Sequence, residues 1–137
     1  MKYEIPKCLA AILSEGRPSF GEQSRQRLIN LLRAECLRGG FLPKLFTLDE
    51  LDQANSVLHS ADRRWFLGER HPGITPGFID VAKTVIFGQI EPESPLALDQ
   101  RCTPNEVIYF GDVHHVSCWI SLKIDCNEFI DIVFKRA

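Results

Sequence analysis

The sequence has no apolar run long enough to cross a membrane. A spanning helix needs about 18 apolar residues in succession, and the short run from Leu9 to Leu13 stops at Ser14. Met1 and Lys2 are not followed by the apolar stretch of a secretory leader. We therefore expect a cytoplasmic protein that does not act in a membrane.

Cysteine and histidine motifs that bind metal are also missing. The five cysteines are an odd number, and the chain has neither a CxxC nor an HxxxH pair, the usual spacings of zinc ligands. Adjacent His114 and His115 would point to opposite faces of a strand, so they predict a polar turn rather than a zinc site. We expect no metal, no cofactor and no disulfide, with reduced thiols at Cys8, Cys36, Cys102, Cys118 and Cys126.

Signals of catalysis are equally sparse. No glycine-rich nucleophile elbow accompanies the cysteines and histidines, whose pairings are expected by chance. Gly39-Gly40 follows a predicted helix instead of preceding one, the wrong polarity for phosphate binding. Glu91 and Glu93 resemble paired glycosidase carboxylates, but the Pro92 between them predicts a loop rim rather than a cleft. The sequence therefore favours a protein that is not an enzyme.

The chain has no basic stripe of the kind that nucleic-acid-binding proteins carry. Its net charge is −2, and residues 80–131 hold nine acidic and three basic side chains, a net charge of −6. Two interpretations stay open: a solvated surface with helix caps, or an acidic face for a basic protein partner such as a nuclease toxin. The acidic residues are Asp80, Glu91, Glu93, Asp99, Glu106, Asp112, Asp125, Glu128 and Asp131.

Helical signals are concentrated in the first half of the chain. Residues 5–13 fit a short helix or a docking arm. Ser19 and Glu22 form a capping-box pattern that predicts a helix over 21–37, which Gly39-Gly40 would end. Thr47 and Glu50 form a second capping box, which predicts a helix that continues through Leu58.

Strand signals dominate the second half. Residues 41–46 contain Pro43 and fit only an edge strand, and residues 59–76 are expected to be irregular. Strands are predicted over 84–90, 96–99, 106–110 and 116–120, and Asp125 is predicted to cap a last helix with a buried stripe. The pattern predicts a single α+β domain with an antiparallel or mixed sheet of about four to six strands and helices packed on it.

One stretch carries a family resemblance. Residues 93–101 read ESPLALDQR and lead into the apolar strand of 104–111; Trp119 and the amphipathic segment 125–134 follow. This order resembles the SUKH superfamily, which includes Smi/Knr-type fungal cell-wall regulators and bacterial immunity proteins. The resemblance covers about residues 28–134, so residues 1–27 are expected to be an N-terminal helical extension.

The resemblance implies a binding protein without shared catalytic residues. It favours an immunity protein that neutralises a cognate bacterial toxin by covering its surface; the alternative is a regulatory or scaffolding adaptor of the same fold. It specifies no oligomeric state.

Individual site residues are predicted from their types and positions. Asp99 and Arg101 are expected to form a structural pair. Trp65 with Arg64 is a candidate binding anchor, because Trp and Arg dominate interface hot spots. The predicted partner-binding residues are Trp65, Arg64, Glu91, Glu93 and Asp112.

Overall fold

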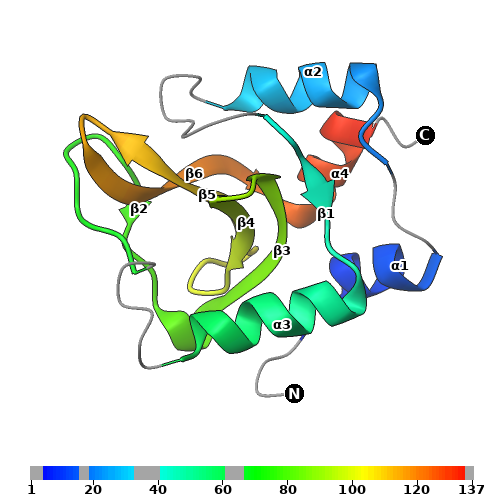
Figure 1. The fold of residues 1–137 in the computed structure, drawn as a ribbon, viewed down its shortest axis with the longest axis horizontal. Helices are drawn as coiled ribbons and strands as arrows, with labels where there is room; N and C mark the ends of the chain where they lie inside the picture. Colours follow the sequence, from blue (N-terminus) through cyan, green and yellow to red (C-terminus); the bar gives the residue numbers. More distant parts are fainter. Residues whose placement is uncertain (1–4, 16–18, 33–40, 61–66, 135–137) are drawn as a thin grey trace.

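The centre of the fold is a meander of antiparallel strands, β3 to β6, in which each strand pairs with the next along the chain. The computed structural model describes residues 5–15, 19–32, 41–60 and 67–134. Two short strands extend the sheet to the order β1-β3-β4-β5-β6-β2 (Figure 1). The strands are β1 Lys44–Leu45, β2 Pro76–Gly77, β3 Thr84–Glu91, β4 Ser94–Asp99, β5 Glu106–Val113 and β6 Val116–Asp125.

Helices pack on this sheet and on one another. Helix α4 contacts α1, α2 and the strands β5 and β6, while α3 contacts β3. In Figure 1, α2 and α4 lie together near one edge of the sheet, and α3 runs beneath it. The predicted single α+β domain is confirmed. The helices are α1 Lys7–Glu15, α2 Glu22–Leu31, α3 Leu48–Leu58 and α4 Cys126–Phe134, with a 3₁₀ turn, η3, at Val81–Lys83.

Both faces of the sheet are buried. Alternate residues of a strand point to opposite faces, and β4 illustrates this, because Leu96 and Leu98 lie in one apolar cluster and Ala97 in another. The first cluster includes Leu9 of α1, and the second includes Leu58 of α3. Burial of both faces explains why the central strands are nearly continuous apolar runs. Across the described ranges, no helix combines the length and hydropathy needed to cross a bilayer.

Two predicted helix starts have the expected hydrogen bonds and one does not. In α3, the Glu50 amide donates to Thr47 Oγ1 over 3.0 Å and the Thr47 amide donates to Glu50 Oε1 over 2.9 Å, so this capping box is confirmed. At α4, the Glu128 amide donates to Asp125 Oδ1 over 2.8 Å. The predicted Ser19 cap is wrong, because Gly21 is the N-cap of α2 and no side chain caps that helix.

Other boundaries differ from the sequence expectation. Helix α2 ends at Leu31, and Leu32 is already extended with a ψ of 160°, so the helix is not continuous over the predicted range of 21–37; residues 33–37 lie outside the described residues. The expected Gly39-Gly40 stop lies outside the described residues. The edge strand predicted within 41–46 is confirmed as β1. Strand β2 lies at the end of a segment expected to be irregular, and its pairing with β6 closes the other edge of the sheet.

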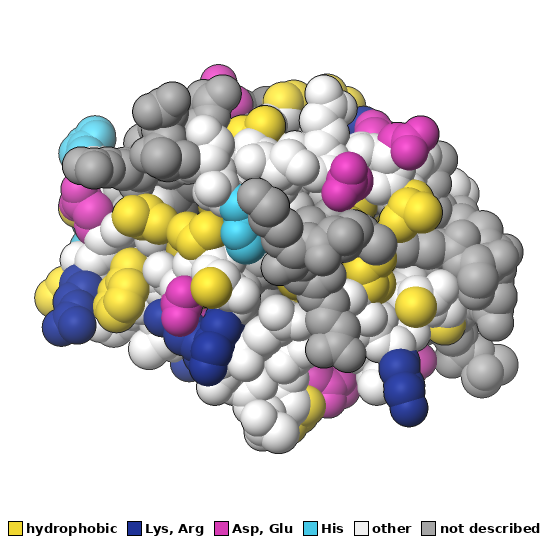
Figure 2. Space-filling model, turned by 90° about the horizontal axis from the view of Figure 1, so that it is seen from below, with side chains coloured by type: hydrophobic (Ala, Val, Ile, Leu, Met, Phe, Trp, Pro, Cys, Tyr) yellow, Lys and Arg dark blue, Asp and Glu magenta, His cyan; other side chains and the backbone are white. Residues whose placement is uncertain are grey.

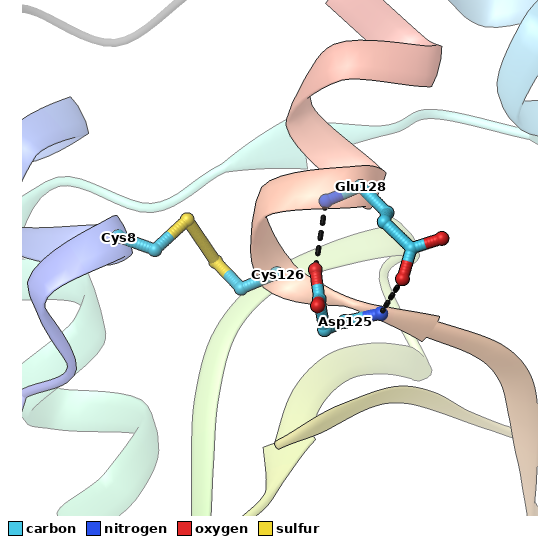
Figure 3. The surroundings of a disulfide bond; sticks show 4 residues. All are labelled: Cys8, Asp125, Cys126 and Glu128. Carbon is cyan, nitrogen blue, oxygen red and sulfur yellow. Dashed lines mark hydrogen bonds between the residues drawn. A yellow bond between two sulfur atoms is a disulfide. The ribbon is translucent and has the colours of Figure 1, made fainter. Parts of the chain in front are cut away.

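A disulfide joins Cys8 of α1 to Cys126 of α4 (Figure 3). The two Cα atoms are 6.3 Å apart, within the range that a disulfide spans. The prediction that both thiols are reduced is therefore wrong. Sequence spacing could not reveal the bond, because the partners are 118 residues apart and meet only where α1 packs on α4. Cys102 and Cys118 are not part of a disulfide, and Cys36 lies outside the described residues.

Replacing Phe129 by Ala should lower the free energy of unfolding by about 3–5 kcal/mol. The side chain is fully buried, and its ring lies edge-on to Phe87 with centroids 5.8 Å apart. Ile132→Ala is the matched control on α4, because Ile132 is 40% exposed; it should change stability by only about 0.5 kcal/mol. Urea unfolding measures both, and equal losses would contradict the assigned buried face.

Breaking the disulfide should lower the free energy of unfolding by about 2–5 kcal/mol, because the bond restricts a long loop in the unfolded chain. Cys8→Ser in non-reducing buffer and the wild type in dithiothreitol should lose the same amount of stability in urea unfolding. Peptide mapping without reductant should recover the segments around Cys8 and Cys126 as one linked species. Finding them only as separate peptides would refute the pairing.

Candidate functional site

The predicted site residues do not form one cluster. Trp65 and Arg64 lie outside the described residues. Glu93 is exposed at the turn between β3 and β4. Asp112 is half-buried near the end of β5, where it accepts a hydrogen bond of 3.1 Å from Ser117 Oγ. Because β3 and β5 run in the same direction, Glu93 and Asp112 lie at the same end of the sheet.

Glu91 is not a surface residue. It is 1% exposed, and Ser94 Oγ donates to its Oε1 over 3.1 Å. The two residues face each other in the register of β3 and β4, so the turn between these strands encloses the carboxylate. The prediction that Glu91 is an exposed partner-binding residue is therefore wrong.

The acidic residues between 80 and 131 are not one continuous face. Asp99 is buried like Glu91, and Asp80 accepts from the amide of Ala82 at the 3₁₀ turn. Asp125 and Glu128 cap α4 (Figure 3). On the face viewed in Figure 2, acidic and basic side chains are interspersed with hydrophobic ones. Most of these carboxylates therefore serve the fold, and the interpretation as a single acidic face is wrong.

Asp99 and Arg101 pair closely at the end of β4. Arg101 Nε donates to Asp99 Oδ1 over 3.0 Å, and Nη2 donates to Oδ2 over 3.1 Å. The same Nη2 donates to the carbonyl of Phe78 over 2.7 Å. Hydrogen bonding to Asp99 raises the pKa of Arg101. The pair joins the end of β4 to the segment that follows β2, which is a structural role.

A concave surface, a groove, lies between α3 and the strands β1 and β3. Its volume is about 350 Å³. Its lining combines apolar side chains, of which Ile86 and Pro95 are buried, with polar ones, of which Lys44 and Gln53 are exposed. We call it the α3 groove, and its lining residues are Lys44, Phe46, Glu50, Gln53, Ala54, Val57, Ile86, Gln89, Pro92 and Pro95.

A buried asparagine fixes the back of the α3 groove. Asn55 is fully buried; its Nδ2 donates to the carbonyls of Leu51 and Ile86, each over 2.8 Å. The amide of Ile86 donates to Asn55 Oδ1, also over 2.8 Å. The register of β3 and β4 shifts between Ile86 and Gly88, so the side chain bonds the backbone of β3 beside an irregularity. Asn55 therefore sets the distance between α3 and β3, and with it the width of the groove.

Charged groups surround the entrance of the α3 groove. Lys44 and Glu50 form an ion pair there, and Lys44 Nζ lies 5.5 Å from the centroid of the Phe46 ring. The hydrogen bond from Lys44, together with that from the Thr47 amide, lowers the pKa of Glu50 from 4.5 to about 2. Asp49 and Asp52 are exposed on α3. Lys44 and Glu50 are thus the charged members of the described lining, and Glu93 follows the lining residue Pro92.

The side chains that line the α3 groove are aliphatic, aromatic, amide or charged, or come from proline. Among the described residues that line it, none has a thiol, imidazole or hydroxyl side chain. In residues 5–15, 19–32, 41–60 and 67–134, no three His, Cys, Asp or Glu side chains are placed to hold a metal ion. Sequence reasoning missed the groove because its residues come from three separate segments. In the sequence, the two prolines at positions 92 and 95 were the one local feature that could have pointed to this groove.

Comparison with known proteins provides no relative for this site. No protein-family model, curated protein or solved structure matches the chain.

Neutralising Glu50 should make the free energy of unfolding of the protein less dependent on pH. A carboxylate whose pKa is lowered in the folded state stabilises the fold above its unfolded value and loses this contribution as pH falls. We expect the difference in free energy of unfolding between wild type and Glu50→Gln to be complete above pH 4.5 and to vanish towards pH 2. The difference should be small, since about a third of the side chain is exposed to solvent.

Urea unfolding at several pH values measures this difference. Lys44→Gln is the matched variant, because the lysine is the largest cause of the lowered pKa. In that background, Glu50→Gln should have a weaker pH dependence. An unchanged pH dependence would contradict the assignment of Lys44 as the main cause.

Proposed function

We propose that this protein is an immunity-type binding protein, similar to those of the SUKH superfamily, that neutralises a bacterial toxin by covering its surface. The observation that best supports the proposal is the α3 groove, whose apolar lining can receive a side chain of a partner. The superfamily resemblance of residues 28–134 supports it from the sequence. In this proposal the protein is not an enzyme and works by stoichiometric occlusion.

The charges around the α3 groove favour a basic partner. Asp49 and Glu93, each next to a lining residue in the sequence, would face lysine or arginine side chains of the toxin, while an apolar side chain enters the groove beside Phe46 and Val57. Nuclease toxins fit this description, because contact with the phosphate backbone requires a basic surface. Opposite charges speed the encounter, and the desolvated apolar contact slows dissociation.

The proposal places the protein in the cytoplasm, where the nucleic acids that such a toxin attacks are found. Disulfides are normally kept reduced in that compartment, so there the bond between Cys8 and Cys126 would contribute nothing to stability. Binding should then be the same in dithiothreitol, because neither cysteine lines the α3 groove.

An affinity pull-down of the chain from its native cells, followed by kinetics with the captured partner, tests the proposal. Gln53→Arg puts a cation into the α3 groove and should weaken binding at least about tenfold. Ser56→Arg is the matched control, since Ser56 is exposed on the same helix outside the groove lining. Higher ionic strength should slow association of the wild type, because exposed charges are screened.

The outcomes distinguish the alternatives. A partner whose toxic activity is lost on binding would support the proposal. A partner without toxic activity would favour the regulatory or scaffolding adaptor instead. Equal effects of Gln53→Arg and Ser56→Arg would show that the toxin binds elsewhere and would refute the assigned groove.

A further inference from the structure

A second concave surface lies at the opposite edge of the sheet from the α3 groove. It is formed around β2, which pairs with β6, whereas the α3 groove lies at the β1 and β3 edge (Figure 1). Its volume is about 380 Å³. We call it the β2 hollow, and its lining residues are Arg70, His71, Pro72, Ile74, Pro76 and Phe78.

An exposed aromatic ring at the β2 hollow is flanked by two guanidinium groups. Phe78 is 37% exposed, and the Cζ atoms of Arg70 and Arg101 lie 5.0 Å and 5.4 Å from its ring centroid. These distances are those of cation–π contacts. Exposed aromatic and arginine side chains are the types that contribute most to protein interfaces.

The backbone beneath this ring is firmly held. The carbonyl of Phe78 accepts a hydrogen bond from Arg101, which is itself paired with Asp99. Gly68 forms a bridge with Phe78, and the amide of Ile79 donates to the carbonyl of Leu67 over 2.9 Å. A rigid surface loses little conformational entropy on binding, so the β2 hollow is prepared for a partner.

The two arginines at the β2 hollow differ in their availability. Asp99 matches the charge of Arg101. Within the described part of the chain, no carboxylate forms an ion pair with Arg70, which is exposed. Arg70 is the lining residue with a permanent positive charge, and no carboxylate is among the described lining residues. The polar side of the β2 hollow therefore favours an anionic group, and its walls of proline, isoleucine and phenylalanine favour an apolar one.

We propose that the β2 hollow binds a protein segment in which an aspartate or glutamate stands next to a large aliphatic side chain. The carboxylate accepts two parallel hydrogen bonds from the planar guanidinium of Arg70. The aliphatic side chain packs between Ile74, Pro76 and the ring of Phe78. The β2 hollow shares no lining residue with the α3 groove, and its acidic partner segment has the opposite charge to the toxin surface proposed there.

Peptide titration followed by amide NMR tests this surface on the intact protein. The probe is an acetylated, amidated peptide of sequence Ala-Leu-Glu-Leu-Ala, and its control contains Gln in place of Glu. We expect saturable shifts centred on residues 70–78 and the neighbouring part of β6, with the Gln peptide about tenfold weaker because it lacks the charge. Arg70→Gln and Phe78→Ala should abolish binding, whereas Lys83→Gln, an exposed cation outside the lining, should preserve it.

Several results would overturn this proposal. These are equal affinity for the two peptides, full binding by folded Arg70→Gln, shifts centred on the α3 groove, and no saturable shift at millimolar peptide. Tighter binding of an oligothymidylate at residues 70–78 would also overturn it, by assigning the hollow to nucleic acid. Failure here leaves the toxin proposal standing, because Gln53→Arg tests a different set of residues.

Discussion

The hydrogen bonds from the Asn55 side chain to the backbone of Leu51 and Ile86 join α3 to β3 on one face of the sheet. Strand β1 pairs with Gln89 and Gly88 of β3 and does not reach Ile86, and leaving backbone groups buried without partners is costly. Asn55 provides both a donor and an acceptor for the backbone of Ile86, so these groups are paired at full burial. The same bonds attach α3 to β3. The α3 groove lies beside this attachment, between α3 and the strands β1 and β3.

The strands and the later helices could be predicted because their signals are local. Runs of β-branched and apolar residues mark β3 to β6, and the capping boxes at Thr47 and Asp125 depend on residues three positions apart. Ser19 shows the limit of this approach, since its pattern matches a capping box but Gly21 takes the cap position. A cap depends on the backbone angles at one residue, which a three-residue spacing does not determine.

The site was harder to predict because it depends on long-range packing. Glu91 looked like a surface carboxylate beside a proline, and only its register with Ser94 encloses it. The partner of Cys8 is 118 residues away. The α3 groove draws on segments around 44–57, 86–89 and 92–95, none of which is distinctive alone. Arg70 lies in the segment expected to be irregular and Phe78 lies just after it, and the pairing of β2 with β6 gives them a fixed place.

The link between α1 and α4 also determines how the domain would respond to mechanical tension. A pulling force applied before Cys8 and after Cys126 would pass through the sulfur–sulfur bond. The residues between the two cysteines would then carry no force. The sheet would then keep its strand register under forces that separate the strands of a fold without such a disulfide. Once the thiols are reduced, the same force would act on α1 and α4 directly and could detach these helices from the sheet first. Whether Cys8 and Cys126 are oxidised or reduced would therefore determine which part of the molecule carries the force.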